Sequence, residues 1–284
     1  MTVWIGTPRA GDLRPDAEAR IDAADAGFTH GLGLFETMRV ERGRVFLLPW
    51  HLERMRLGAA RLGIDLPEDA LLQDVVRAVI EANDPSRVDP LRGASPVSHV
   101  QRLRLTVSPG TGETVLLCTI AELEPATPDA RLLTSPWRRN ERSALAGVKS
   151  TSYAELLLAQ REAVRGGATD ALLWNTVGEV AECATANVFV FLEDGIRTPP
   201  PTAGILPGIG RRFVLALGEA SAPVREAVVR PQDLARADGA FCVSALRGIR
   251  PIVEVDHAPI AVSSAVSSLM ARYHDATAAA WCWT

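Results

Sequence analysis

One polar, proline-containing segment divides the chain, and this division constrains the fold more than any other feature of the sequence. Residues 122–129 read ELEPATPD, with two prolines and little apolar content, which is typical of a linker between domains. We therefore expect a small N-terminal domain over residues 1–123, a linker at 124–130 and a larger C-terminal domain over 131–284. A length of 284 residues accommodates two domains of ordinary size.

The first part has the pattern of a small α/β domain. Alternating apolar residues predict strands at 34–40, 45–48, 100–107 and 114–121. Residues 49–62 and 67–82 carry apolar side chains three or four positions apart, which predicts two helices. Residues 1–20 contain two glycines and two prolines, so we expect only one short strand there, at 2–5. Residues 83–98 read as a polar loop with three prolines.

The second part alternates short strands with turns. Strands are expected at 131–135, 170–174, 179–182, 188–192, 224–228, 240–243 and 246–255, and longer helices at 153–165, 209–219 and 263–280. So many short strands around few helices indicate a sheet or barrel. The fold class is therefore α/β (α+β), with the larger sheet in the second domain.

Composition excludes several functions. The net charge of −4 argues against a nucleic-acid or anionic-membrane surface as the main partner. The four cysteines are widely spaced and lack metal-ligand spacing, so we expect buried free thiols and no metal site. No secretory signal or apolar run of about 20 residues is visible, which favours a cytoplasmic soluble protein.

Lys149 is the only lysine, whereas the other 29 of the 30 basic side chains are arginines. Arginine can replace lysine for solvation and surface charge, but a guanidinium cannot attack a carbonyl and form an imine. A single lysine beside a small polar Ser-Thr-Ser run therefore favours a role that only an amine can fill. The alternative is a leftover surface lysine.

An imine-forming lysine needs a carbonyl, either of the substrate, as in Schiff-base aldolases, or of an aldehyde cofactor such as pyridoxal phosphate. The cofactor also needs an anion pocket for its phosphate and a carboxylate for its pyridinium nitrogen. Residues 206–211, LPGIGR, run from a glycine-containing loop into a helix and can supply the anion site, or only a helix cap. Glu182 lies among small apolar residues and can supply the carboxylate, or pair with an arginine. Arg54 can add charge to a phosphate pocket, or be a solvated helix residue.

The order of these motifs resembles the fold-type IV (class IV) pyridoxal-phosphate enzymes, which include branched-chain and D-amino-acid aminotransferases and 4-amino-4-deoxychorismate lyase. The resemblance covers roughly residues 25–256. It runs through GLGLFETMRV, HLER, VKSTSYAELLLA, GEVAECATANVF, DGIRTPPPTAGILPGIGR and ALRGIRPIVEVD. It implies a two-domain fold with a pseudo-barrel sheet in the larger domain, pyridoxal 5′-phosphate as cofactor and a homodimer.

The resemblance also implies roles for individual residues. Lys149 resembles the lysine that forms the internal aldimine and moves the proton during catalysis. The expected cofactor-binding residues are Arg54, Lys149, Tyr153, Glu182, Leu206, Gly208, Ile209, Gly210, Ser244 and Ala245. The chain departs from the family's pattern at two positions. Many members have threonine where this chain has Gly210, and the tyrosine of branched-chain enzymes lies one residue beyond the position of Tyr153.

The substrate must carry a carboxylate, and Arg39, Arg104 and Arg247 are the candidates to bind it. The chain lacks the Arg-x-His trap of well-studied D-amino-acid enzymes, having Thr111-Gly112-Glu113 at that place. We expect transamination between a small amino acid, of D-amino-acid or branched-chain type, and a 2-oxo acid. The alternative is 4-amino-4-deoxychorismate lyase, which releases pyruvate and 4-aminobenzoate in the folate pathway. The ECATAN and SAL segments resemble those of the lyases. A scaffold protein that has lost catalysis is disfavoured by the lysine at the required position.

Overall fold

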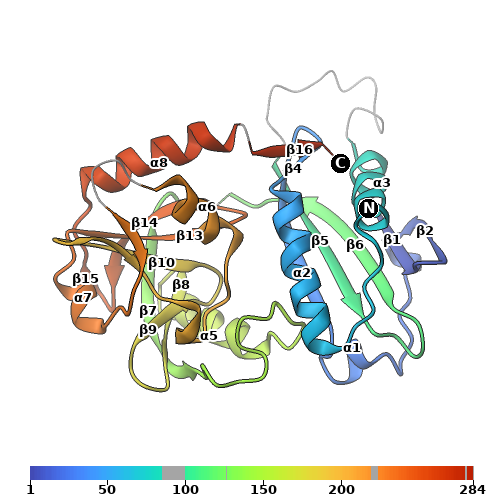
Figure 1. Cartoon of the computed structure of the whole chain (residues 1–284), viewed down its shortest axis with the longest axis horizontal. Helices are drawn as coiled ribbons and strands as arrows, with labels where there is room; N and C mark the ends of the chain where they lie inside the picture. Colours follow the sequence, from blue (N-terminus) through green and yellow to red (C-terminus); the bar gives the residue numbers. More distant parts are fainter. Residues whose placement is uncertain (85–99, 126, 219–222, 279, 284) are drawn as a thin grey trace. The chain divides into compact units, whose positions relative to one another are not determined.

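The computed structural model describes residues 1–84, 100–125, 127–218, 223–278 and 280–283. The chain forms two compact units (Figure 1). The first comprises residues 1–124, 149–152 and 280–284, and the second comprises 125–148 and 153–279. The boundary falls between Glu124 and Pro125, at the edge of the expected linker. Unlike the expected division, the first unit also includes the lysine-bearing segment and the C-terminal residues.

The first unit is built on a seven-stranded antiparallel sheet in the order β16-β4-β3-β5-β6-β1-β2. Its strands are β1 (Thr2–Thr7), β2 (Ala10–Pro15), β3 (Leu34–Glu41), β4 (Arg44–Phe46), β5 (Val100–Ser108), β6 (Val115–Glu122) and β16 (Trp281–Trp283). The predicted strands at 34–40, 100–107 and 114–121 are confirmed. The expectation of a single strand in residues 1–20 was wrong, because Thr2–Thr7 pairs along its whole length with Ala10–Pro15.

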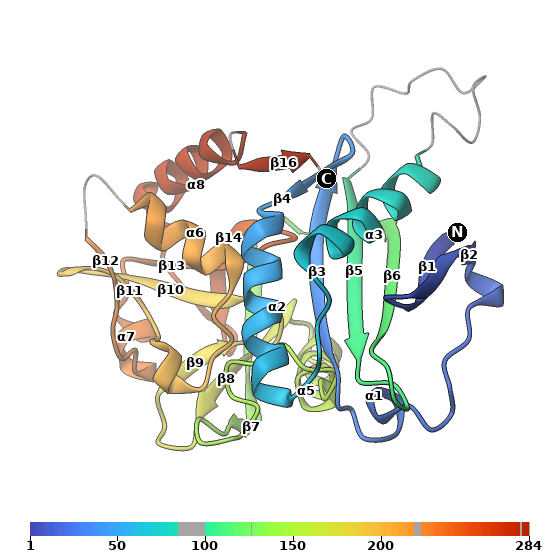
Figure 2. The same cartoon turned by 45° about the vertical axis from the view of Figure 1, so that its right-hand side comes forward.

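Helices pack on one face of this sheet (Figure 2). They are α2 (Leu48–Leu62) and α3 (Asp69–Ala82), with the short η1 (Asp16–Glu18) and α1 (Ala26–Thr29) elsewhere. Met38 and Leu103 on the sheet and Leu52 and Val76 on the helices are fully buried. The apolar residues of α2 and α3 are three or four positions apart, so they form one buried face on each helix. Both helices were predicted from this spacing.

The second unit contains a mixed, curled sheet in the order β12-β11-β10-β13-β14-β7-β8-β9, with β15 paired to β14. The strands are β7 (Ala130–Arg139), β8 (Asp170–Asn175), β9 (Val180–Cys183), β10 (Asn187–Leu192), β11 (Gly195–Thr198), β12 (Val224–Glu226), β13 (Gly239–Ser244), β14 (Gly248–Val255) and β15 (Ala258–Pro259). The helices are α5 (Ala154–Arg165), η2 (Pro201–Ala203), α6 (Ile209–Leu217), α7 (Pro231–Ala235) and α8 (Ser264–Thr277). The expected α/β fold with a half-barrel sheet in the larger unit is confirmed.

The sheet of the second unit encloses a core of small and branched side chains. Leu132, Leu172, Val188 and Ile252 are fully buried and pack together with Cys183 and Cys242. Cys118, in the first unit, is likewise buried, and these three of the four cysteines are free thiols, as expected. None of the described helices is long and apolar enough to cross a membrane.

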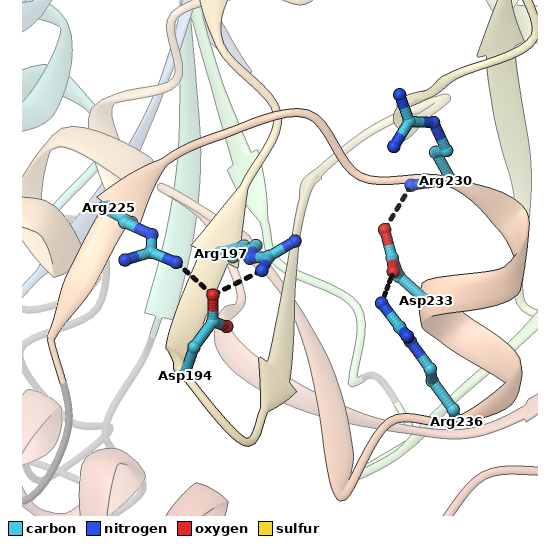
Figure 3. Close-up of polar contacts among 6 residues, drawn as sticks. All are labelled: Asp194, Arg197, Arg225, Arg230, Asp233 and Arg236. Atoms are coloured by element: carbon cyan, nitrogen blue, oxygen red, sulfur yellow. Dashed lines mark hydrogen bonds and ion pairs between the residues drawn. The ribbon is translucent and has the colours of Figure 1, made fainter.

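Many arginines of the second unit are used in local ion pairs around β11, β12 and α7 (Figure 3). Asp194 accepts hydrogen bonds from Arg197 and Arg225. Asp233 accepts from the backbone N–H of Arg230 at 2.8 Å and from Arg236 Nη2 at 2.5 Å. The side chains of Asp194, Arg197 and Arg225 are all partly exposed, so the ion pairs among them contribute little stability. Arg197 and Arg225 therefore serve mainly as surface charge.

Candidate functional site

Lys149 is held against the edge of β3 by backbone hydrogen bonds. The Phe35 N–H donates to the Lys149 carbonyl at 3.0 Å, and the Thr151 N–H donates to the Gly33 carbonyl at 2.8 Å. Ser150, between them, forms an isolated bridge with Leu34. This register places the amine of Lys149 4.4 Å from the centre of the Phe35 ring. The sole lysine is therefore fixed to a strand, with its amine beside an aromatic face.

Glycines before β3 allow this close approach. A Cβ atom on Gly33 would lie 2.8 Å from the Val107 carbonyl oxygen and 3.0 Å from Thr151 Oγ1. Gly31 has a φ of +66°, and a Cβ there would lie 2.5 Å from Ser152 Oγ. The glycines that lead into the strand in the sequence thus make room for the segment that carries Lys149.

Arg54 belongs to a buried charge cluster on the helix-covered face of the same sheet. Glu36, on β3, is fully buried and accepts from Arg54 Nε at 2.8 Å and from Arg54 Nη2 at 2.6 Å. His51 Nδ1 lies 2.6 Å from the second oxygen of Glu36. A bidentate contact of this kind fixes the plane of the guanidinium group.

The protonation of this cluster follows from its burial. Burial alone would raise the pKa of Glu36, but the charge of Arg54 and the hydrogen bonds from Arg54 and His51 lower that pKa to about 2. Burial lowers the pKa of His51 against the opposing effect of Glu36. We therefore assign a neutral His51 at pH 7, with Nδ1–H donating to an ionised Glu36.

Two of the expected substrate arginines lie on the opposite face of the sheet. Arg39 Nη2 lies 3.3 Å from Glu41. Arg104 donates from Nε to Thr106 Oγ1 at 3.1 Å, and its guanidinium carbon lies 3.7 Å from the centre of the Phe35 ring. The first unit therefore brings Arg104 and Lys149 to one aromatic ring.

Glu182 is the buried acidic centre of the second unit. Glu182 lies on β9 and is 4% exposed. One carboxylate oxygen accepts from the Leu206 backbone N–H at 3.0 Å, and the other lies 3.3 Å from Arg139 Nε. Asn187 donates to the Leu206 carbonyl at 2.9 Å and holds the loop on the other side. The expectation that this carboxylate does not serve solvation is consistent with its burial, and an arginine does accompany it.

The loop after Leu206 leads into α6 without a side-chain cap. Gly208 is the N-cap residue, and no side chain of the described ranges caps the helix there. A Cβ on Gly208 would lie 2.0 Å from Asn187 Oδ1, and one on Gly210 would lie 3.0 Å from Val243 Cγ2 and 3.1 Å from the Ser244 carbonyl carbon. Backbone N–H groups at such a helix start attract anions. Packing against β13 gives a physical reason for glycine at 210.

The remaining expected site residues also lie in the second unit. Tyr153 donates its hydroxyl to the Ala184 carbonyl at 2.7 Å, so this tyrosine is anchored to the turn that follows β9. Ser244 and Ala245 lie at the end of β13 and in the turn beyond it. Ser244 Oγ accepts from the Arg247 backbone N–H at 3.2 Å, which fixes the turn.

A polar pocket of about 210 Å³ opens beside this turn. Ser244, Arg247, Arg250 and Asp170 are among the residues that line it. Burial raises the pKa of Asp170 to about 6, although hydrogen bonds from Thr185 and from the backbone N–H of Ala171 oppose the shift. Arg247 therefore belongs to a polar environment within the second unit.

The side chains present fit the demands of a phosphorylated aldehyde cofactor. The second unit offers a buried carboxylate and an uncapped helix start with two glycines, while the first offers an amine and a fixed guanidinium group. Four residues of this framework were missed by the sequence reasoning: Glu36, His51, Arg139 and Asn187. Glu36 carried a signal, since it interrupts the apolar run of β3 on its buried face.

Comparison with known proteins decides the family. Residues 33–255 match the family described as amino-transferase class IV. The chain belongs to this family. Class IV aminotransferases depend on pyridoxal 5′-phosphate, in agreement with the expected cofactor.

Relatives within the class IV family have different activities. The chain is 29% identical over 260 residues to a putative branched-chain-amino-acid aminotransferase of Methanocaldococcus jannaschii, covering 87% of this chain and 86% of the relative. It is 27% identical over 252 residues to a D-alanine aminotransferase of Bacillus licheniformis, covering 87% of each. It is also 27% identical over 221 residues to an aminodeoxychorismate lyase of Bacillus subtilis, covering 72% of this chain and 71% of the relative.

A solved structure agrees with the family assignment. The fold IV transaminase CpuTA1 from Curtobacterium pusillum has a TM-score of 0.86 and 26% sequence identity, covering 98% of both chains. The class IV fold is thus shared along almost the whole length of the chain.

Proposed function

We propose that this class IV enzyme transfers the amino group of a small amino acid, of D-amino-acid or branched-chain type, to a 2-oxo acid. The observation that carries the proposal is Lys149. It is the sole lysine, lies within the family match at 33–255, and has its backbone hydrogen-bonded to β3 so that its amine lies beside Phe35. When bound, pyridoxal phosphate supplies an aldehyde for this amine and an electron-withdrawing ring.

We assign a separate role to each residue of the site. Lys149 holds the cofactor and moves the proton at the substrate carbon. Glu182 would supply the carboxylate that keeps the pyridine nitrogen protonated, and Leu206, hydrogen-bonded to this carboxylate through its N–H, would supply an apolar contact for the ring. The N–H groups of Ile209 and Gly210, with Gly208 at the cap, bind the phosphate together with Arg54 and the turn at Ser244 and Ala245. Tyr153 would bind the cofactor hydroxyl, and Arg39, Arg104 or Arg247 would bind the substrate carboxylate.

The second candidate is an aminodeoxychorismate lyase that releases pyruvate and 4-aminobenzoate. It is supported by the Bacillus subtilis relative and by the ECATAN and SAL segments around Glu182 and Ser244. Lys149, Glu182 and Arg54 would serve both reactions. We rank transamination first because it is the broader class and because the first relatives above are aminotransferases. We also propose a homodimer, as the family resemblance implies.

One pair of assays tests the proposal. Purified protein reconstituted with pyridoxal phosphate is given D-alanine or L-leucine with 2-oxoglutarate and, separately, aminodeoxychorismate. Glutamate formed from an amino acid supports transamination, whereas pyruvate and 4-aminobenzoate released without a 2-oxo acid show the lyase. Borohydride should fix the cofactor to Lys149, as located by peptide mass spectrometry. Lys149→Arg, which keeps the charge and removes the nucleophilic amine, should lose this fixation and the activity. A protein that takes up no pyridoxal phosphate would overturn both candidates.

A further inference from the structure

The polar pocket of the second unit lies on the other side of the sheet from the Glu182 carboxylate. Side chains alternate along a strand, so Glu182 and Cys183 on β9 point to opposite sides. Glu182 contacts the Leu206 loop, whereas Cys183 packs in the core with Cys242. Cys242 lines the pocket, and neither Glu182 nor Leu206 is among the described residues that line it. The pocket is therefore separate from the carboxylate that we assign to the cofactor.

The ends of several elements meet at this pocket. Asp170 begins β8, Thr185 lies in the turn between β9 and β10, Ser244 ends β13, and Arg250 lies near the start of β14. A volume of about 210 Å³ corresponds to roughly seven water molecules at liquid density. The pocket therefore fits a small molecule and not a nucleotide or a peptide.

Arg250 is fixed in the wall of the pocket but keeps an unused donor. Its Nη2 donates to Thr127 Oγ1 at 3.0 Å and to the Asp129 carbonyl at 2.5 Å, so the orientation of the guanidinium group is set. Its Nε is buried and donates to no residue in the part of the chain that the structure describes. An N–H group withdrawn from water without an acceptor is energetically costly, and such a group calls for a ligand, an ion or ordered water.

Ser244 supplies a second donor. The threonine hydroxyls of the pocket already donate to protein acceptors: Thr127 to the Asp129 carbonyl, Thr169 to the Arg131 carbonyl and Thr185 to Asp170. Ser244 Oγ accepts from the Arg247 backbone N–H, and none of the described residues accepts its hydrogen. Arg250 Nε and the Ser244 hydroxyl are thus two donors that the wall leaves for a ligand.

The charges of the wall select the sign of that ligand. Arg247 and Arg250 supply two positive charges and Asp170 one negative charge, and the described lining residues include no other charged side chain. Asp170 already accepts from the Ala171 N–H at 2.8 Å and from the N–H and hydroxyl of Thr185 at 3.2 and 2.6 Å, so it does not require a cation. A wall with excess positive charge and two unused donors suits an oxyanion, because guanidinium groups bind carboxylate and phosphate oxygens through charge-assisted hydrogen bonds.

We infer that this pocket is a second binding site, for a small oxyanion such as a carboxylate or inorganic phosphate, with Arg250 as its main contact and Arg247 and Ser244 beside it. The inference goes beyond the proposed function and does not depend on it, since the site requires neither the cofactor nor the reacting amino group.

Calorimetric titration of the holoenzyme at pH 8 tests the inference. Sulfate, inorganic phosphate and propanoate are the probes, which separates tetrahedral oxyanions from carboxylates. Asp170, with a pKa of about 6, is ionised at this pH. Arg250→Gln should weaken binding of the preferred probe about 30-fold, because the charge and the Nε donor are lost. Asp170→Asn, which removes the opposing charge, should strengthen it about tenfold.

Arg131→Gln is the matched control. Arg131 is exposed on β7 and is not among the residues that line the pocket, so its replacement removes the same charge and should leave the affinity unchanged. A wild type that binds none of the three probes overturns the inference, and so does an Arg250→Gln variant with wild-type affinity. If Arg250→Gln does not fold, Arg250→Lys keeps the charge without the Nε donor and should bind about fivefold more weakly. Unchanged affinity in that variant also overturns the inference.

Steady-state kinetics test whether the site is a separate one. An oxyanion bound through Arg250 should leave KM for the organic substrate unchanged, because the two molecules occupy different places. Competition with the substrate that disappears in Arg250→Gln would make the pocket part of the substrate site and would overturn the inference of a second site.

Discussion

Arg54 and Glu36 form a bidentate pair with hydrogen bonds of 2.8 and 2.6 Å, one to each carboxylate oxygen. The Glu36 side chain is 1% exposed and the Arg54 side chain 10% exposed. Because both ends of the pair are withdrawn from water, the orientation of Arg54 is set by the protein interior and not by solvent. If Arg54 binds the cofactor phosphate, Glu36 determines how that guanidinium group is presented.

The first prediction concerns this pair. Glu36→Gln keeps the shape of the side chain but leaves Arg54 without a compensating charge, so the free energy of unfolding should fall by about 3 kcal/mol. Affinity for pyridoxal phosphate should fall about tenfold as the guanidinium group loses its fixed plane. Denaturant unfolding and cofactor titration measure the two effects. Asp25→Asn is the matched control, because Asp25 is an equally buried carboxylate in the same unit, bonded to Gly27 and Ser108. A loss of stability with unchanged cofactor affinity in Glu36→Gln would make Glu36 purely structural.

The same pair also predicts acid sensitivity. The folded-state pKa of Glu36 lies below its ordinary value, so its contribution to stability is fully present above about 4.5 and is lost as the pH falls towards about 2. Wild type should lose stability over this window more steeply than Glu36→Gln. Equal slopes in acid unfolding curves of the two proteins would contradict the assignment.

Asp170 should make the free energy of unfolding depend on pH in the opposite direction. Its folded-state pKa of about 6 is above the ordinary value of 3.8, so its contribution to stability is greatest below pH 3.8 and is lost as the pH rises to about 6. The wild-type free energy of unfolding minus that of Asp170→Asn should therefore decrease by about 3 kcal/mol across this range. Chemical denaturation at a series of pH values measures the difference. A difference that is independent of pH would show that Asp170 is ionised at an ordinary pKa.

Glu182→Gln should affect both catalysis and stability. The variant retains an oxygen that can accept from the Leu206 N–H, but it carries no charge to stabilise a protonated ring nitrogen, so the kcat of transamination should fall about 100-fold. The thermal midpoint should also fall, because Arg139 loses the charge that lies 3.3 Å from its Nε. Glu179→Gln, three residues earlier, is the control because Glu179 pairs only locally, with Asn175, among the contacts described. Wild-type turnover in Glu182→Gln would remove this carboxylate from the mechanism.

Gly208 predicts a steric effect. A methyl group at this position would lie 2.0 Å from Asn187 Oδ1 and would displace the side chain that holds Leu206. Gly208→Ala should lower the free energy of unfolding by about 2 kcal/mol and weaken binding of inorganic phosphate and of the cofactor. Gly112→Ala serves as the control, since a Cβ there meets no atom within 4 Å. An unchanged phosphate affinity would show that the start of α6 is not the anion site.

Local patterns in the sequence account for much of the fold. Strands such as Leu34–Glu41 and helices such as Asp69–Ala82 were predictable because their apolar periodicity reflects one buried face. The pairing of Thr2–Thr7 with Ala10–Pro15 was not, since its residues 10–15 are largely exposed and carry no apolar alternation. The C-terminal strand Trp281–Trp283 was also missed, because it is specified by a partner, Arg44–Phe46, more than two hundred residues away.

The residues of the candidate site were likewise predictable only in part. Lys149 and Glu182 could be found from the sequence because each is chemically out of place among its neighbours. Asn187 could not, since its contact with Leu206 depends on a loop returning to β10. Arg139 could not either, since its contact with Glu182 depends on the order of β7, β8 and β9 in the sheet. The different partners of Arg104 and Arg39 likewise could not be predicted, because strand alternation alone places both arginines on one face.

The attachment of residues 149–152 to β3 has a consequence for how the protein is made. Gly31 and Thr151 are 120 residues apart in the sequence and are joined by a hydrogen bond, and β4 receives its outer partner only from the C-terminal Trp281–Trp283. During synthesis the edge of β3 therefore stays unpaired until residue 152 has emerged, and that of β4 until almost the whole chain has emerged. Unpaired edges favour association with other chains. A fragment ending at Glu124 should accordingly self-associate in solution. The two units are compact in space, but they cannot be completed one after the other in time.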